Sequence, residues 1–419
     1  MAWVCDAGEH GKLNLFQIGL LLGTEVAIPE FTFINPAPKK EAKQIADLLV
    51  DQHGLVVLRF SYYEHTHRIL YHLAHSERKE NTTLRSLRIH GGPNTHHFRW
   101  MCGFFKTFTG LHELSIPTRP LDYLDAHDIG TLVLARPDSV LTRLNLSFND
   151  TMGDRGIASL CTALENNTVL TELNLSQCVV TPSSADFVKR MVSTNTTLHS
   201  LILERLTAGT TDPEPFVRNG TLRTLNLGIN RFTASQLSGA YKALEFNTSL
   251  TTLCLSRDIN VSTTAVPVQP DVLRLNSTLT DLDIAHWNLS TQSFSAIVGD
   301  LTANASLTRI VLANDHAGRQ VSAAELAPLF ARNRTLRVFE CGKLDLGIPY
   351  TPTLDLLAIA VYKNPVILSI GEQFTNSDAF AWSLMRNKKN LERKSTTLLE
   401  IMLKRDIITN NTLKRQRIK

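Results

Sequence analysis

A short apolar pattern recurs along most of the chain at intervals of 24 to 31 residues. One copy reads Leu-Thr-Arg-Leu-Asn-Leu-Ser-Phe-Asn from Leu141, and the next reads Leu-Thr-Glu-Leu-Asn-Leu-Ser-Gln-Cys from Leu170. Apolar and polar residues alternate in each copy, which predicts a short strand with one buried face. The copies, whose mean interval is about 28 residues, begin at Leu55, Leu84, Leu111, Leu141, Leu170, Leu198, Leu222, Leu250, Leu279, Leu307, Leu336 and Ile367.

A helical pattern follows the predicted strand in the better copies. Two sets with the spacing i, i+3, i+4 and i+7 are Ile157, Leu160, Cys161 and Leu164, and Leu237, Ala240, Tyr241 and Leu244. This spacing places apolar side chains on one face of a helix. One strand–helix unit cannot bury its own apolar edge, so we expect the units to stack with parallel strands inside and helices outside.

These repeats resemble the leucine-rich repeat family, specifically its long-repeat, ribonuclease-inhibitor-like class, in which a strand alternates with a full helix. The resemblance implies an α/β fold, a leucine-rich repeat solenoid or horseshoe. Parallel strands would form its concave face and helices its convex face. By analogy with the family, it also implies that the concave face binds a protein.

An asparagine stands three residues before the leading apolar position in nine of the units. Asparagine tolerates the left-handed conformation that ends many helices, so we predict that these residues turn the chain from helix to strand. Seven of the nine lie in Asn-X-Ser/Thr sequences, which resemble glycosylation acceptors. Because the repeat alone accounts for their positions, we interpret them as structural. The nine are Asn81, Asn167, Asn195, Asn219, Asn247, Asn276, Asn304, Asn333 and Asn364.

Two units depart from the pattern. The unit at 198–221 contains Pro213 and Pro215, so we expect a helical element of about one turn. The unit at 250–278 carries Pro267 and Pro270 where a helix would begin, which predicts a late start. Either departure is compatible with a binding loop or with a degenerate repeat, and the sequence leaves this choice open.

The chain divides into three predicted segments: 1–54, an N-terminal cap or degenerate first repeat; 55–394, the solenoid with a closing helix; and 395–419, a basic tail. In the first segment we expect an extended stretch over Pro29–Phe33 and a helix over Lys39–Asp51. Residues 364–394, which include Asn364-Pro-Val-Ile-Leu-Ser-Ile-Gly, resemble the last repeat and closing helix of tropomodulins. Those proteins cap the pointed ends of actin filaments, so the resemblance implies actin as an alternative partner.

Charge is concentrated near the end of the sequence. Residues 387–419 hold ten basic and three acidic side chains, which leaves a net charge of −3 over residues 1–386. That body does not favour nucleic acid, which requires a basic face. The basic tail suggests a solvated extension, an acidic partner, a nuclear-import signal or contact with an anionic membrane surface. Its residues are Lys388, Lys389, Arg393, Lys394, Lys414, Arg415, Arg417 and Lys419.

No catalytic or metal-binding motif organises the reactive side chains. The six cysteines stand singly, which indicates a reducing compartment. His65, His67, His72 and His75 lie close together in sequence, but nothing nearby completes a tetrahedral zinc site. Phosphate-binding loops, nucleophile elbows and dinucleotide fingerprints are absent from the sequence. We therefore predict a non-catalytic protein that uses no cofactor or metal.

No apolar run reaches the length of a transmembrane helix, and the N-terminal residues make a poor signal peptide. We therefore predict a cytoplasmic protein, with the nucleus as an alternative.

The positions on either side of the central strand leucine are expected to point away from the core. They are small, polar and mixed in sign, which suits a protein partner better than DNA, RNA or a single phosphate. We predict a non-catalytic recognition or scaffold protein. The alternatives are an actin-binding or pointed-end-capping protein and a regulator of a small GTPase, as some proteins of this repeat class are. The candidate binding residues are Arg143, Asn145, Glu172, Asn174, Asn226, Thr252, Asp281, Asp283, Arg309 and Glu340.

Overall fold

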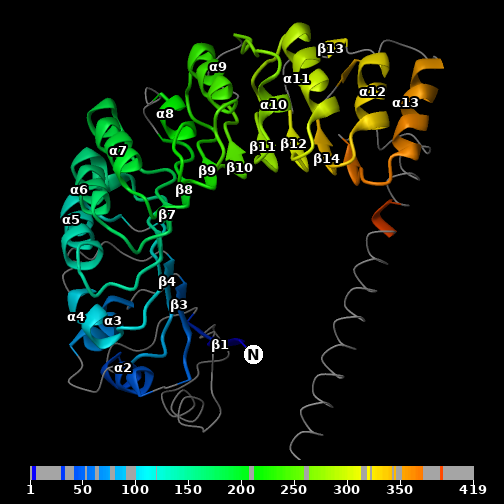
Figure 1. Ribbon diagram of the computed structural model, residues 1–419. Helices are drawn as coiled ribbons and strands as arrows, with labels where there is room; N and C mark the ends of the chain where they lie inside the picture. Colours follow the sequence, from blue (N-terminus) through cyan, green and yellow to red (C-terminus); the bar gives the residue numbers. More distant parts are fainter. Residues whose placement is uncertain are drawn as a thin grey trace, which may run out of the picture. The chain divides into compact units, whose positions relative to one another are not determined.

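A computed structural model of the 419-residue chain shows two compact units, unit 1 (Met1–Val261) and unit 2 (Ser262–Lys419). Each unit alternates strands and helices (Figure 1). The structure describes residues 2–5, 30–33, 42–51, 54–61, 66–75, 81–90, 101–118, 120–206, 212–258, 264–312, 319–320, 323–341, 344–345, 352–370 and 387–389.

Unit 1 contains a parallel sheet whose strands follow one another in chain order. Its strands are β1 (Ala2–Cys5), β2 (Glu30–Phe33), β3 (Val57–Ser61), β4 (Ser86–His90), β5 (Glu113–Ser115), β6 (Arg143–Asn145), β7 (Glu172–Asn174), β8 (Ser200–Ile202), β9 (Thr224–Asn226) and β10 (Thr252–Cys254). Neighbouring strands pair without a shift in register, so equivalent residues of successive repeats lie side by side.

The central residue of each strand belongs to one buried row. From β2 to β10 the register aligns Phe31, Leu58, Leu87, Leu114, Leu144, Leu173, Leu201, Leu225 and Leu253. All of them are at most 2% exposed. The predicted interior row is therefore confirmed, because the period-two alternation of each strand points its central side chain toward the helices.

The helices of unit 1 lie along one side of its sheet (Figure 1). They are α2 (Ala42–Val50), α3 (Thr66–Ala74), α4 (Met101–Thr107), α5 (Tyr123–Ile129), α6 (Gly153–Glu165), α7 (Pro182–Thr194), α8 (Glu214–Val217) and α9 (Ala234–Ala243), with a π-helical turn at Gly130–Leu134 and a 3₁₀ turn at Asp150–Met152. The eight apolar residues with helical spacing lie in α6 and α9, except for Leu244, which directly follows α9. All eight are buried. The extended stretch and helix predicted near the N-terminus correspond to β2 and α2.

Unit 2 repeats the same arrangement with fewer strands. Its sheet contains β11 (Asp281–Asp283), β12 (Arg309–Val311), β14 (Val338–Glu340) and β16 (Ser369–Ile370), and a second, two-stranded sheet pairs β13 (Arg319–Gln320) with β15 (Leu344–Asp345). Its helices are α10 (Val272–Leu275), α11 (Thr291–Ala303), α12 (Ala323–Arg332) and α13 (Pro352–Lys363). Leu282, Ile310 and Phe339 form an equivalent buried row within this unit, and Ile370 is the register partner of Phe339.

The two irregular repeats have the expected short helices. In the repeat at 198–221 the helical element is α8, which is four residues long. In the repeat at 250–278 the helix is α10, which begins only at Val272 and is also four residues long. Proline has no backbone N–H to donate, so it is tolerated only in the first turn of a helix. Pro215 occupies that first turn in α8, and α10 begins after Pro267 and Pro270.

The nine repeated asparagines are structural, but the predicted left-handed conformation is wrong. Asn195, Asn276 and Asn304 have φ between −73° and −66° and extended ψ. Each of the nine side-chain oxygens accepts hydrogen bonds from the backbone N–H groups two and three residues later, as at Thr197 and Leu198. Extended backbone at the asparagine brings those N–H groups within reach of its own side chain, whereas a left-handed residue would not need this cap.

Left-handed residues do recur in unit 1, at the exits of β5 to β9 rather than at the ends of helices. Thr118, Phe148, Gln177, Arg205 and Ile229 all have φ between 53° and 61°. Each donates its backbone N–H to a carbonyl of the following repeat, as Phe148 does to Ser176 over 2.8 Å. That inter-repeat bond offsets the cost of a left-handed conformation in residues other than glycine.

Among the residues that the structure describes, no helix has both the length and the apolar character needed to cross a bilayer.

Candidate functional site

The candidate site is the side of the unit 1 sheet that faces away from the helices. We call it the strand face and define it by the side chains that flank the buried row on β3 to β10. The first position before the buried residue and the first after it are occupied by Val57 and Arg59, Ser86 and Arg88, Glu113 and Ser115, Arg143 and Asn145, Glu172 and Asn174, Ser200 and Ile202, Thr224 and Asn226, and Thr252 and Cys254.

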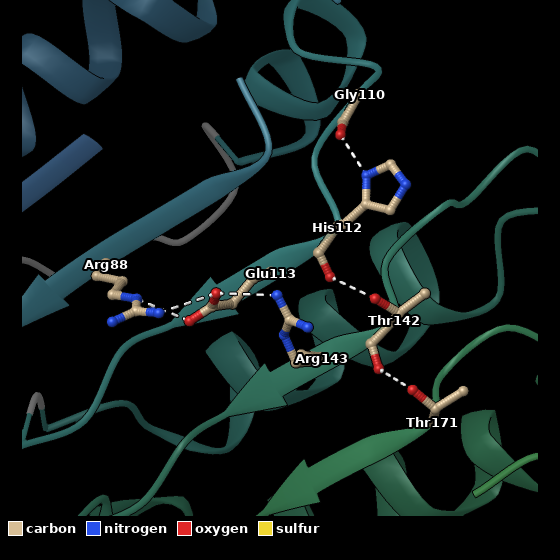
Figure 2. Close-up of polar contacts among 7 residues, drawn as sticks. All are labelled: Arg88, Gly110, His112, Glu113, Thr142, Arg143 and Thr171. Atoms are coloured by element: carbon tan, nitrogen blue, oxygen red, sulfur yellow. Dashed lines mark hydrogen bonds and ion pairs between the residues drawn. The ribbon is translucent and has the colours of Figure 1, made fainter. Parts of the chain in front are cut away.

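Glu113 holds two arginines on this face (Figure 2). Its Oε1 lies 2.7 Å from Nε of Arg88, and its Oε2 lies 3.1 Å from Nη2 of Arg88 and 3.4 Å from Nη2 of Arg143. The side chain of Glu113 is only 14% exposed, whereas that of Arg143 is 49% exposed. Three neighbouring strands therefore contribute one Arg–Glu–Arg cluster.

The electrostatics of the cluster keep Glu113 ionised. Partial burial by itself would raise the pKa of Glu113, but hydrogen bonds and charge from Arg88, a hydrogen bond from Ser86 and the charge of Arg143 outweigh it and lower the pKa. The carboxylate is thus a permanent anchor at neutral pH, and it orients both guanidinium groups.

A second ion pair extends the row toward the N-terminus. Arg59 Nη2 lies 3.1 Å from Oε1 of Glu30 on β2. Arg59 and Arg88 are direct register partners on adjacent strands, so two like charges stand side by side. Burial, Arg88 and Arg59, in that order, lower the pKa of the nearby His90, as expected for a positive local potential.

The edge where the chain enters β4 and β5 adds two more basic side chains. Arg85 donates from Nη1 to the carbonyl of Gly110 over 3.2 Å. His112 places Nδ1 2.5 Å from the same carbonyl (Figure 2). Threonine hydroxyls continue this edge, since Thr142 donates to the His112 carbonyl and Thr171 donates to the Thr142 carbonyl, each over 3.1 Å.

The asparagines predicted as partner contacts have a structural contact as well. Oδ1 of Asn145, Asn174 and Asn226 accepts the backbone N–H two residues later, at distances of 2.8 to 3.0 Å. Each side chain therefore caps the turn that leaves its strand while its amide lies half-exposed on the strand face. Between these positions, Glu172 is exposed and Thr252 is half-exposed.

In unit 2 the predicted residues lie on the sheet of that unit. Arg309 Nη1 donates to Oδ1 of Asp281 over 3.0 Å across β12 and β11. Asp283 accepts the backbone N–H of Ala285, as the asparagines do in unit 1. Glu340 is half-exposed on β14.

Sequence reasoning missed Arg59, Arg88 and Glu113 as site residues. They occupy the same strand positions as Arg143 and Asn145, but in the weaker copies that begin at 55, 84 and 111. Applying the flanking-position rule to those copies would have found them. Which charges pair with which could only be read from the register of the folded sheet.

The basic tail falls almost entirely outside the described residues. Lys388 and Lys389 lie exposed on a short helical turn. The other residues predicted for the tail, Arg393, Lys394, Lys414, Arg415, Arg417 and Lys419, are not described, and neither is most of the tropomodulin-like stretch.

Two of the described cysteines, Cys161 and Cys178, belong to the core. Burial raises the pKa of Cys161 and of Cys178 to about 12, so neither thiol is a nucleophile at neutral pH. His72 lies on α3, and His75 directly follows that helix. Among the described residues, no three His, Cys, Asp or Glu side chains are grouped to hold a metal ion.

Of the comparisons with known proteins, only the comparison with solved structures found similar proteins. No family model and no curated protein sequence matches it. Similar solved structures include the Rad7 and Elc1 complex from yeast, with a TM-score of 0.46, 15% identity and coverage of 85% of this chain and 78% of that chain. An internalin (inlF) from Listeria monocytogenes matches with a TM-score of 0.41 and 16% identity, over 69% of this chain and 73% of that chain. The aligned buried row, the strand–helix repeat and the asparagine contacts establish the fold as an α/β leucine-rich repeat solenoid.

Proposed function

We propose that this chain is a non-catalytic recognition protein that binds a partner protein through the strand face of unit 1. The observation that supports this most directly is the Arg88–Glu113–Arg143 cluster. Its side chains are already held in place by one another before any partner arrives. Preorganised arginines lose little rotamer freedom on binding and are common anchors of protein interfaces.

The dimensions of the face also favour a protein partner. Eight strands at about 4.8 Å span roughly 34 Å, close to what a standard interface of about 800 Å² per partner requires. Small side chains such as Thr224 and Thr252 line the part of the face beyond the charged cluster. A face with both signs of charge and small polar side chains fits a protein surface better than a polyanion.

The finer predictions from sequence stand as proposals beside this one. They are a ribonuclease-inhibitor-like repeat class, a tropomodulin-like end with actin as partner, and regulation of a small GTPase. The residues predicted on unit 2, Asp281, Asp283, Arg309 and Glu340, are proposed as a second polar face.

A blocking substitution tests the proposed function. Thr224→Trp places a large side chain on β9 of the strand face without changing charge. Thr162→Trp places the same side chain on the exposed surface of α6 as a control. Partners are first identified by crosslinking and mass spectrometry in native extract and then titrated with each purified variant. We expect binding to weaken at least tenfold for Thr224→Trp alone. Equal binding by both variants would contradict the proposal.

A further inference from the structure

The N-terminal part of the strand face carries an excess of positive charge. Over β2 to β6 and the residues directly before these strands, the described side chains include Arg59, Arg85, Arg88 and Arg143 against Glu30 and Glu113. The chain as a whole is nearly balanced up to residue 386, with 33 basic and 36 acidic residues. The excess is therefore local to this part of the sheet.

Both carboxylates in the patch are already engaged by arginine. Glu30 contacts Arg59, and Glu113 contacts Arg88 and Arg143. Their negative charge fixes the guanidinium groups without cancelling the excess. Arg143 stays 49% exposed and Arg88 stays 35% exposed.

We propose that this patch binds an acidic segment of the partner protein, with a partner carboxylate seated on the arginines that Glu113 holds. This inference rests on the proposed function. Arg88 meets Glu113 through its Nε and Nη2 edge, so its other edge is the one that suits a second carboxylate in fork geometry. A carboxylate near Arg59 and Arg88 would also relieve the repulsion between these two register partners.

An acidic protein segment fits this patch better than nucleic acid. Glu30 on β2 and Glu113 on β5 lie among the arginines, and Glu172 lies on β7, so a continuous row of phosphates along the sheet would also meet carboxylates. The aromatic residues of these strands, Phe31, Phe33 and Phe60, are at most 1% exposed and offer no base a stacking surface.

The test uses the full chain and a labelled twelve-residue peptide of alternating Glu and Ser, followed by fluorescence anisotropy at low and moderate salt. We expect Arg88→Gln and Arg143→Gln to weaken binding at least fivefold each. Arg190→Gln is the matched control, because Arg190 makes a 2.6 Å ion pair with Glu165 on the helix side and is likewise 51% exposed. A Gln-Ser peptide of equal length should bind none of the proteins measurably.

Several outcomes would overturn the inference. One is equal peptide binding by the wild type and both strand-face variants, and another is no binding by the wild type. Tighter binding of oligouridylate than of the peptide, lost in the same variants, would assign the patch to nucleic acid instead. If Arg143→Gln fails to fold by circular dichroism, Arg143→Lys keeps the charge and should lose only the fork contact. A native partner lost with Thr224→Trp but retained with Arg88→Gln and Arg143→Gln would leave the proposed function intact and remove this inference.

An independent observation concerns the seven Asn-X-Ser/Thr sequences that lie at the repeated asparagines, which are a subset of such sequences in the chain. The side chains of these seven asparagines are engaged by the fold. The side-chain nitrogen of Asn195 donates to the carbonyls of Leu164 and Asn167, and its oxygen accepts from two backbone N–H groups. The hydroxyl of the same sequence is engaged too, since Thr197 donates to the carbonyl of Asn167 over 3.1 Å. Equivalent contacts hold Asn247 and Asn304, which are 6% and 5% exposed.

We infer that N-glycosylation of these seven asparagines and the native fold of this chain exclude each other. A glycan replaces a hydrogen on the same nitrogen that bridges two repeats, and its volume has no place among buried residues. Because glycans are transferred to chains that have not yet folded, passage through that machinery would trap the chain before its repeats stack. The native protein therefore forms only where these sequences escape modification.

The experiment expresses the full chain in mammalian cells with and without an added secretion signal. We expect the signal-bearing chain to carry glycans removable by peptide N-glycosidase and to be insoluble, and the signal-free chain to be unmodified and soluble. Tunicamycin should restore solubility to the signal-bearing chain. A variant that removes only the hydroxyls of the seven sequons at the repeated asparagines should also be soluble without the drug, although it keeps other sequons such as those at Asn145 and Asn174. Its substitutions are Thr83→Val, Thr197→Val, Thr221→Val, Ser249→Ala, Thr278→Val, Ser306→Ala and Thr335→Val. A soluble, cooperatively unfolding chain with a glycan at Asn195 or Asn247 would overturn the inference, as would insolubility that persists under tunicamycin.

Discussion

The side-chain amide of Asn195 donates a 3.0 Å hydrogen bond to the backbone carbonyl of Asn167, the residue at the same position one repeat earlier. Asn333 makes the same bond to Asn304 in unit 2 over 2.9 Å. Each such asparagine accepts from its own repeat and donates to the preceding one. It therefore couples the end of one helix to the start of the next strand.

Removing one of these asparagines should cost far more stability than removing a strand-face asparagine. Asn195→Ala leaves two N–H groups and two carbonyls without their side-chain partner, and we expect a loss of about 3 kcal/mol in the free energy of unfolding. Asn226→Ala removes one half-exposed turn contact and should cost about 1 kcal/mol. Urea denaturation of both variants measures the difference. Similar losses would show that the inter-repeat bonds contribute little.

Two glycines should respond in opposite directions to alanine. A Cβ on Gly103 in α4 would lie 2.2 Å from the carbonyl oxygen of Ala74, so Gly103→Ala forces α4 away from α3 and should cost about 1–3 kcal/mol. A Cβ on Gly299 in α11 meets nothing within 4 Å. Gly299→Ala should therefore stabilise by about 1 kcal/mol through helix propensity. Thermal unfolding of each variant gives the sign, and a tolerated Gly103→Ala would contradict the close packing of α3 and α4.

The stability of unit 2 should fall as pH rises through the titration of Asp300. Burial raises the pKa of Asp300 above its ordinary value of 3.8, even though its carboxylate accepts the backbone N–H groups of Asp271 and Leu273. The folded state thus binds this proton more tightly than the unfolded state. The resulting stabilisation is complete below pH 3.8 and is lost as pH rises through the raised pKa.

Hydrogen exchange of the α10 amides, followed by mass spectrometry across this pH range, measures the effect. Rates are corrected for the intrinsic pH dependence of exchange. Asp300→Asn should remove the pH dependence of protection whatever its effect on absolute stability. An Asn variant that retains the wild-type slope would assign the dependence to another group.

Cysteine labelling should separate the strand face from the core. Cys254 is half-exposed on β10, whereas Cys161 and Cys178 are buried with pKa values near 12. At pH 8 only about one in 10⁴ of such buried thiols is ionised. Iodoacetamide should therefore modify Cys254 before Cys161 and Cys178 in the native chain and the two buried thiols only after denaturation, as judged by peptide mass spectrometry. Early modification of Cys161 would place α6 in a more open environment than the fold describes.

Much of the architecture could be predicted because the repeat makes each local rule apply many times. The alternation around Leu144 and Leu173 identified the buried row, and the helical spacing of Ile157 and Leu160 identified the face that packs on it. The prolines at 213 and 215 predicted the short α8. These features depend on side-chain size and on the presence of a backbone N–H donor, and the type of each residue determines both.

Tertiary structure decided the contacts that join one repeat to another. Asn195 is extended rather than left-handed because its side chain bridges to Asn167, a partner 28 positions away whose distance in space depends on stacking. Glu113 pairs with Arg88 and Arg143 because the unshifted register brings three separate strands together. Hydrophobic periodicity sets which way a side chain points, but ion pairs and inter-repeat hydrogen bonds depend on which residues lie opposite, and only the packed sheet determines that.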